Sequence, residues 1–210
     1  MIDIVFILDE SVSMAPYSSH YIECINSFLE TQKIQNPSSR FTLIKFNTTV
    51  NVLCKDERID TLPKFTSEHY RPFGVTSLYD AIGRAMNLKY TDGVKNVIMF
   101  ILTDGEDNNS FEFTCEQIKD KVKYLSSIGG WSFVYIATNQ NAQIAGEKLG
   151  IDTCLVYNET KKSIEQIVNA CNIAIGHIIH KLTGIENKYS HTDMPTDVRE
   201  LTNILNNFNI

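Results

Sequence analysis

The sequence lacks long apolar runs. Its longest uninterrupted apolar run, at residues 97–102, has six residues, whereas a membrane-spanning helix needs about 20. The first apolar run has no cationic residues before it, so it does not follow the pattern of a secretory signal peptide. These absences predict a cytoplasmic protein without membrane association.

Basic clusters and regularly spaced cysteines are also missing. The formal net charge is −6, the pI is near 5.4, and lysine and arginine occur singly or in pairs, so we do not expect nucleic acid as a partner. An odd number of cysteines without a CxxC pair argues against a disulfide framework or a zinc site. The cysteines are Cys24, Cys54, Cys115, Cys154 and Cys171.

Strand-like and helix-like apolar patterns alternate along the chain. Short apolar runs predict strands at residues 2–8, 41–46, 50–54, 96–103, 132–137 and 153–156. Stripes with the period of an α-helix predict helices at residues 18–34, 78–86, 118–125, 141–148 and 164–182. Residues 55–73 are charged and contain Pro63 and Pro72, which predicts mostly loop.

The order of these elements predicts the fold class. Alternating strands and helices form parallel sheets, and the continuous apolar strand at 96–103 indicates helices on both faces. The polar turn at 47–49 indicates a hairpin whose second arm is antiparallel. We expect an α/β, Rossmann-like, doubly wound sheet of six strands, mostly parallel with one antiparallel edge strand. Residues 1–183 should form this domain, and residues 184–210 a linker and a C-terminal helix at 196–208.

A cluster of oxygen-bearing side chains follows the first strand. Asp9, Ser11 and Ser13 form a DxSxS motif. In open α/β sheets, ligand sites lie at the carboxyl ends of the strands, and hydroxyl and carboxylate oxygens are ligands that Mg²⁺ prefers. Taken alone, the motif also fits a turn or a helix cap, because Asp and Ser favour both.

Two further segments carry oxygen donors at similar positions. Thr76 lies in the sequence GVTS just before the second predicted helix, and Asp104 directly follows the strand at the centre of the chain. Each lies in a loop that adjoins the carboxyl end of a strand. Both segments would therefore bring oxygen donors to the sheet edge at which the DxSxS motif is expected.

The segments DESVS, GVTSLYDA and LTDGEDN, in this order, resemble the three metal-site loops of the von Willebrand factor type A (vWA) domain. The resemblance covers about residues 2–183, and the nearest members are short, free-standing intracellular proteins. In that family the site is called MIDAS, a metal-ion-dependent adhesion site. The resemblance implies that Ser11 and Ser13 ligate the metal directly and Thr76 directly or through water. It implies that Asp9 and Asp104 act mainly through water or hydrogen bonds.

The resemblance also implies protein binding. The expected ion is Mg²⁺, with Mn²⁺ or Ca²⁺ as alternatives. Three neutral hydroxyls leave the ion electrophilic, so an Asp or Glu of a partner protein is a strong final ligand. One departure from the family pattern is Val12, where intracellular members often have glycine, but the two hydroxyls and their spacing are kept.

Two other functions stay open at this point. A Mg²⁺-dependent phosphatase of the haloacid dehalogenase type also has an acid after its first strand, but it needs a second Asp two residues later, where this chain has Ser11. The chain also lacks GxxxxGK and GxSxG motifs, so we do not expect an enzyme. The second alternative is a structural scaffold whose metal site has lapsed. The oligomeric state is left open.

Acids near the motifs allow two interpretations. Asp80, one helical turn after Thr76, either reaches back toward the site or only caps or solvates the start of its helix. The polar residues 106–109 either shape a partner surface or are only solvated. For both groups of residues, the second interpretation, without a role in function, is the more common one in proteins.

Overall fold

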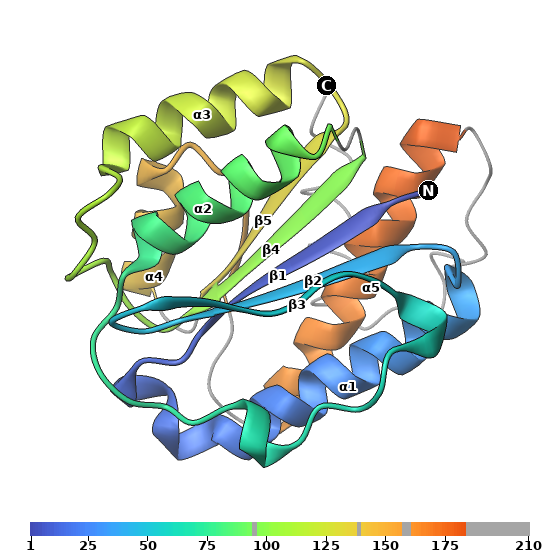
Figure 1. The fold of residues 1–210 in the computed structure, drawn as a ribbon, viewed down its shortest axis with the longest axis horizontal. Helices are drawn as coiled ribbons and strands as arrows, with labels where there is room; N and C mark the ends of the chain where they lie inside the picture. Colours follow the sequence, from blue (N-terminus) through green and yellow to red (C-terminus); the bar gives the residue numbers. More distant parts are fainter. Residues whose placement is uncertain (94–95, 138–139, 157–160, 184–210) are drawn as a thin grey trace.

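A six-stranded, mostly parallel sheet forms the centre of the molecule (Figure 1). The computed structural model describes residues 1–93, 96–137, 140–156 and 161–183. The strand order is β3-β2-β1-β4-β5-β6, and only β3 is antiparallel to its neighbour, which confirms the predicted fold class. The strands are β1 Asp3–Asp9, β2 Arg40–Phe46, β3 Val50–Arg58, β4 Val97–Thr103, β5 Trp131–Ala137 and β6 Thr153–Val156.

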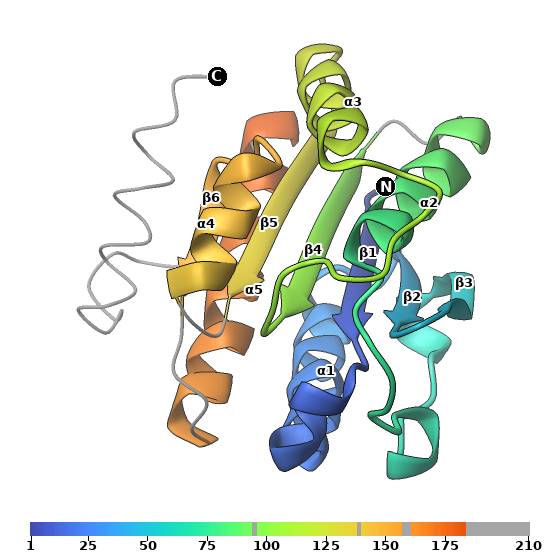
Figure 2. The same ribbon diagram turned by 90° about the vertical axis from the view of Figure 1, so that its left-hand side faces the viewer.

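Helices cover both faces of the sheet (Figures 1 and 2). α1 and α5 lie on one face, and α2, α3 and α4 lie on the other. Within the described residues, no helix is long and apolar enough to cross a membrane. The predicted linker and C-terminal helix, residues 184–210, lie outside the described residues. The helices are α1 Ser18–Gln35, α2 Leu78–Thr91, α3 Cys115–Ser127, α4 Gln140–Lys148 and α5 Lys161–Thr183.

The two central strands are buried along their whole length, which explains their continuous apolar sequences. All residues of β1 and β4 are buried. Ile4, Phe6 and Leu8 pack toward α1 and α5, whereas Val5 and Ile7 pack toward α2 and α3. Successive side chains of a strand point to opposite faces, so a strand between two helical layers needs apolar residues at nearly every position.

β3 is longer than predicted. Residues 55–58 are predicted as loop, but they continue the strand to Arg58. A bulge shifts the register against β2, and Asp56 has a positive φ of 54°. The Arg40 guanidinium donates to the Asp56 carbonyl oxygen (2.8 Å), and the Asp56 N–H donates to Thr42 Oγ1 (3.1 Å). The prediction was wrong because an edge strand that faces solvent can carry charged residues, which hide its apolar period.

A buried ion-pair cluster ties α2 to the amino end of β1. Lys89 is fully buried, and its Nζ lies 3.0 Å from the Asp3 carboxylate and in contact with that of Asp56. Burial raises the pKa of Asp3, and the nearby Lys89 opposes this shift. Buried charges are costly unless they are paired, so these three side chains depend on one another. The cluster lies at the end of β1 opposite to the predicted site.

Candidate metal-binding site

Three loops adjoin the carboxyl edge of the sheet. The first loop (residues 9–13) follows β1, the second loop (73–77) precedes α2, and the third loop (103–110) follows β4. β1 and β4 are parallel neighbours, so their last residues, Asp9 and Thr103, lie side by side. Figure 2 shows the arrowheads of both strands at the same edge of the sheet.

Asp9 is a buried carboxylate held by two donors. Its Oδ1 accepts the Ser11 N–H (2.7 Å), and its Oδ2 accepts the Thr103 hydroxyl (2.6 Å). Burial raises the pKa of Asp9 to about 6; both hydrogen bonds oppose this shift, and the nearby Asp104 adds to it. Within the described residues, no lysine or arginine pairs with this carboxylate. The site therefore contains a buried negative charge that a cation would stabilise.

The two serines and Asp104 form a hydrogen-bonded chain. Ser13 Oγ donates to Asp104 Oδ1 (2.9 Å), and Ser11 Oγ lies 3.1 Å from Ser13 Oγ. A hydroxyl has one proton, so when Ser13 donates to Asp104 it can only accept from Ser11, whose own proton is also within reach of Asp9. Burial raises the pKa of Asp104, and the hydrogen bond from Ser13 opposes this shift. Because Ser11 is buried and Ser13 is exposed, the chain of hydroxyls leads from the interior to the surface.

Thr76 is attached to the third loop through its backbone. Its N–H donates to Asn108 Oδ1 (2.9 Å), and its carbonyl oxygen accepts the Asn108 N–H (3.0 Å). The Gly74 carbonyl oxygen accepts the Val12 N–H (3.2 Å), which joins the second loop to the first. Gly74 has a φ of 75°, and a Cβ there would lie 2.4 Å from Thr48 Oγ1, so the position requires glycine.

The structure places the five predicted site residues on three adjoining loops. Asp9, Ser11, Ser13 and Asp104 belong to one hydrogen-bonded network. Within the described part of the chain, the Thr76 hydroxyl makes no hydrogen bond to the other four, and only the loop backbone relates it to them. The role of the five residues as metal ligands stays a prediction.

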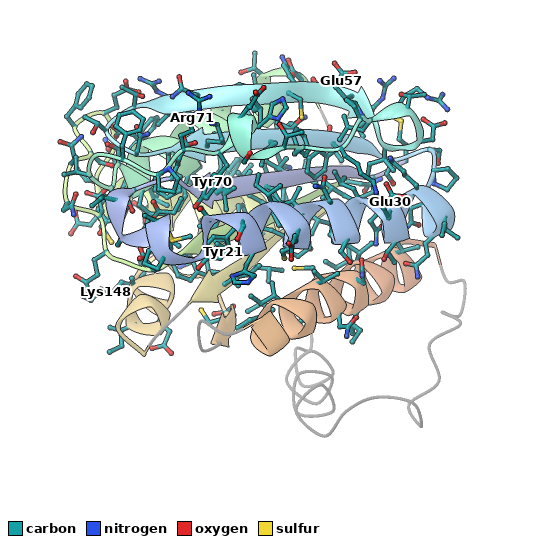
Figure 3. The ribbon with its side chains drawn as sticks, turned by 90° about the horizontal axis from the view of Figure 1, so that it is seen from below. Tyr21, Glu30, Glu57, Tyr70, Arg71 and Lys148 are labelled. Carbon is teal, nitrogen blue, oxygen red and sulfur yellow. The ribbon has the colours of Figure 1, made fainter. Side chains whose placement is uncertain are left out.

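Glu10 and Tyr70 support the first loop and are not predicted from the sequence. The buried Glu10 carboxylate forms an ion pair with Lys45 (2.7 Å) and accepts the Arg71 N–H (2.6 Å). The Tyr70 hydroxyl donates to the Asp9 carbonyl oxygen (2.6 Å). Figure 3 shows that Tyr70 and Arg71 lie toward the same end of the molecule. The only local signal is an acid directly after a buried strand, since the partners of Glu10 lie 35 and 61 residues away.

The spacing of the donors fits a magnesium ion. Mg²⁺ takes six oxygen ligands at about 2.0–2.1 Å in an octahedron, so neighbouring ligand oxygens lie about 2.9 Å apart. The Ser11–Ser13 oxygen separation of 3.1 Å, between the two serines predicted to ligate directly, is close to this value. A hydroxyl that donates its proton keeps lone pairs for a cation. Within the described residues, no group of three or more His, Cys, Asp or Glu side chains could hold a metal ion.

A comparison with protein families finds one match that spans most of the chain. The family model for the von Willebrand factor type A domain matches residues 3–170. This range contains all three loops and the six strands of the sheet. A search of curated proteins gives no significant match.

Solved structures share the fold at low sequence identity. The von Willebrand factor type A structure from Catenulispora acidiphila has a TM-score of 0.62 and 16% identity, over 83% of this chain and 43% of that chain. The pilus adhesin SpaC from Lactobacillus rhamnosus GG has a TM-score of 0.64 and 14% identity, over 83% and 30%. The vWF domain of the type V pili tip protein Mfa5 from Porphyromonas gingivalis has 0.60 and 11%, over 83% and 96%. This chain thus spans less than half of the first two structures.

Proposed function

The chain belongs to the von Willebrand factor type A domain family, and we propose that it is a metal-dependent protein-binding module. Domains of this family commonly serve as protein-interaction modules. In our proposal the three loops hold Mg²⁺, and an Asp or Glu of a partner protein completes the coordination. The observation that carries the proposal is the hydrogen-bonded chain from Ser11 through Ser13 to Asp104, which brings hydroxyl and carboxylate oxygens together beside the buried Asp9.

Each of the five residues has a distinct role in this proposal. Ser11, Ser13 and Thr76 would hold the ion, with Mn²⁺ or Ca²⁺ as alternatives to Mg²⁺. Asp104 accepts a hydrogen bond from the Ser13 hydroxyl, so the lone pairs of this hydroxyl point away from Asp104. The buried Asp9 adds negative charge close to the serines. When bound, the ion supplies a positive centre to which a carboxylate can attach, because the neutral hydroxyls leave much of its charge uncompensated.

We propose binding rather than phosphoryl transfer. A nucleophilic carboxylate has to reach the phosphorus atom, but Asp9 is fully buried and both of its oxygens accept hydrogen bonds. The second acid that the phosphatase reaction needs is replaced by Ser11, whose N–H is bonded to Asp9. These contacts support a role for Asp9 in holding the first loop in place and in supplying a negative charge there.

Exposed apolar side chains lie next to the proposed site. Val12 is 64% exposed, Phe73 58% and Val75 42%. The Val12 N–H is bonded to the Gly74 carbonyl oxygen, so these side chains belong to two loops in contact. Apolar residues beside a polar anchor are common in protein interfaces. This arrangement supports a protein as the partner.

We propose that the protein works in the cytoplasm. All five cysteines are unpaired. Burial raises the pKa of the Cys24 and Cys171 thiols, which keeps them protonated and unreactive. Unpaired, unreactive thiols are typical of proteins in a reducing compartment, which supports this location.

Cation binding by the wild-type protein tests the proposal. Mg²⁺ at about 100 times its Kd should raise the free energy of unfolding by about 2.7 kcal/mol, measured by urea unfolding in Mg²⁺ and in EDTA. Ser13→Ala removes a proposed ligand and should lose most of this gain. Ser19→Ala, which changes an exposed serine of α1, should keep it.

The same protein can report on the proposed carboxylate ligand. Acetate should displace water from bound Mn²⁺ and so lower the water-proton relaxation rate of the complex. A wild-type protein with equal free energies of unfolding in Mg²⁺ and EDTA would refute the proposal and favour a scaffold without a working metal site.

A further inference from the structure

Asp80, in the first turn of α2, binds the segment that follows the third loop. Asp80 is only 2% exposed. Its Oδ2 accepts the Phe111 N–H (3.1 Å), and its Oδ1 accepts the N–H groups of Glu112 (2.9 Å) and Phe113 (3.0 Å). Asp80 is an acid in the first turn of α2, as predicted, but its two oxygens accept the N–H groups of residues 111–113, a role that the sequence does not predict. Three donors on one buried carboxylate form a strong junction.

The third loop in turn caps the start of α2. The N-cap residue Ser77 makes no side-chain capping hydrogen bond. Instead, the Tyr79 N–H donates to Asp107 Oδ1 (3.2 Å), and the Asp80 N–H donates to Ser110 Oγ (3.0 Å). The first N–H groups of a helix need partners from outside the helix, and a negative charge is favourable at this end. α2 and the third loop therefore satisfy each other's polar groups.

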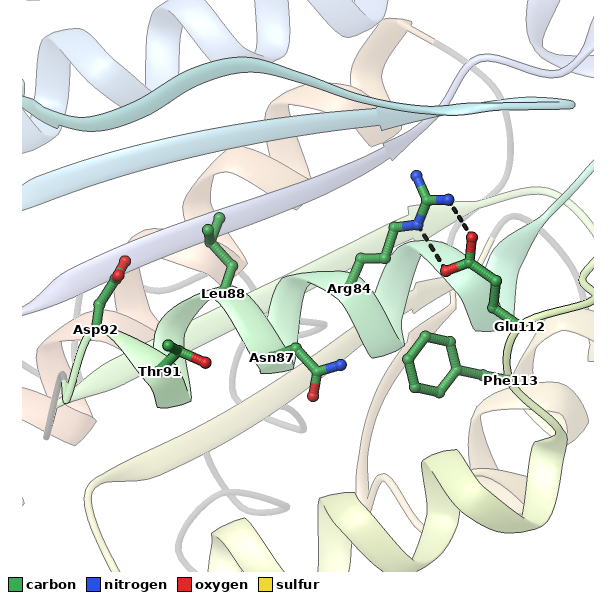
Figure 4. Close-up of a pocket in the computed structure, with 7 residues that line it drawn as sticks. All are labelled: Arg84, Asn87, Leu88, Thr91, Asp92, Glu112 and Phe113. Atoms are coloured by element: carbon green, nitrogen blue, oxygen red, sulfur yellow. Dashed lines mark hydrogen bonds and ion pairs between the residues drawn. The ribbon is translucent and has the colours of Figure 1, made fainter.

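Side-chain packing strengthens the same junction. A Cβ at Gly83, in α2, would lie 2.5 Å from the Phe113 ring, so glycine allows the ring to lie directly on the helix. Arg84 forms an ion pair with Glu112, with Nε 2.8 Å from Oε2. Figure 4 shows this ion pair and the Phe113 ring beside α2. Residues 111–113 are thus held on α2 by backbone, ring and charge contacts.

We propose that Asp80 is a positioning residue for the metal site, an inference that rests on the proposed function. Thr76 precedes Asp80 by four residues, and Asp104 precedes Phe111 by seven. The Asp80 junction therefore lies close to both proposed site residues along the chain, and it holds the second and third loops as one unit. Asp80 is buried, and three backbone N–H groups hold its carboxylate, so we assign it a positioning role and not that of a ligand.

Asp80→Asn provides the direct test. The amide turns one carboxylate oxygen into an NH₂ group that faces a backbone N–H, so two donors oppose each other. At a temperature where both proteins are folded, Mn²⁺ affinity measured by isothermal titration calorimetry should fall about tenfold. The matched control is Glu112→Gln, which removes only the ion pair of the same segment, and it should change affinity by less than about twofold.

A second variant and a second measurement complete the test. Ser110→Ala removes the acceptor of the Asp80 N–H together with the hydroxyl that donates to Asp107, and it should weaken Mn²⁺ binding about threefold, so it tests the junction if Asp80→Asn does not fold. Hydrogen exchange in EDTA does not depend on the metal. The N–H groups of residues 111–113 should exchange faster in Asp80→Asn than in the wild-type protein or Glu112→Gln.

The outcomes separate this inference from the proposed function. If the wild-type protein binds Mn²⁺ and both Asp80→Asn and Ser110→Ala bind it equally tightly, the positioning role is wrong and the proposed function stands. Weaker binding with unchanged exchange at residues 111–113 also overturns the role, because the loss would then not come from the junction. If the wild-type protein binds no Mn²⁺, the proposed function fails and the inference fails with it.

Discussion

Asp9→Asn should stabilise the metal-free protein although it removes a residue of the proposed metal site. The substitution replaces a buried charge by a neutral amide of nearly the same shape. The Asn Oδ1 can accept the Ser11 N–H, and its NH₂ group can donate to Thr103 Oγ1. The Thr103 proton can then turn to the Gly105 carbonyl oxygen, 3.3 Å away. Each group that now bonds to Asp9 keeps a partner, so we expect the loss of charge to outweigh the second amide proton of Asn, which gains none.

The pKa of Asp9 sets the size of this effect and its pH dependence. Burial raises this pKa from its ordinary 3.8 to about 6, a difference that corresponds to at most about 3 kcal/mol. Because hydrogen bonds to an amide are weaker than those to a carboxylate, we expect a gain of about 2 kcal/mol at about pH 7.5. Between the two pKa values the folded wild-type protein binds a proton that the unfolded chain has released, so its stability falls as pH rises. The gain of Asp9→Asn should therefore vanish near pH 4 and be complete above about pH 6.5.

Urea unfolding in EDTA at several pH values, followed by circular dichroism, measures the effect. Asp120→Asn, at an exposed position, serves as control and should change stability by less than about 0.5 kcal/mol. Saturating Mg²⁺ should reduce or reverse the stability difference between the two proteins, because the wild-type protein, which keeps the Asp9 charge, gains more from the ion. The reasoning is wrong if Asp9→Asn is less stable than the wild-type protein in EDTA at neutral pH, or if the difference does not change with pH.

Two further substitutions test the packing around α2, both by urea unfolding in EDTA. Gly83→Ala improves helix propensity by about 1 kcal/mol, but its Cβ meets the Phe113 ring, so we expect a net loss of about 1 kcal/mol. In a Phe113→Ala background the same change should stabilise; a gain in the wild-type background would contradict the ring contact. Lys89→Met leaves the buried Asp3 without its cation and should cost about 3–5 kcal/mol. Adding Asp3→Asn should recover part of this loss, and an unchanged loss would contradict the proposed pairing.

Most elements of the fold could be predicted from local patterns. β1 and β4 are recognisable because a strand covered on both faces needs apolar residues throughout. β6 occupies the predicted residues, 153–156. The sequence pattern does not predict residues 55–58 of β3. This part of the strand pairs through its backbone at an exposed edge, and its charged side chains show no apolar alternation.

The sequence by itself determined which groups come to the carboxyl edge of the sheet. The DxSxS motif and Asp104 directly follow buried strands, and parallel strands end at one edge, so the sequence assigns Asp9, Ser11, Ser13 and Asp104 to that edge. This inference needs only local burial and strand direction. The position of Thr76 relative to them depends on a loop whose path is not local.

Only the tertiary structure decided which distant residues hold these loops in place. Glu10 binds Lys45 and the backbone of residue 71, and Asp80 binds the backbone of residues 111–113. Acids and N–H groups of this kind occur throughout the chain, and many pairings would be chemically equivalent. The pairing that forms depends on how the packed helices and strands direct the connecting segments, because a hydrogen bond requires its atoms to lie within about 3 Å.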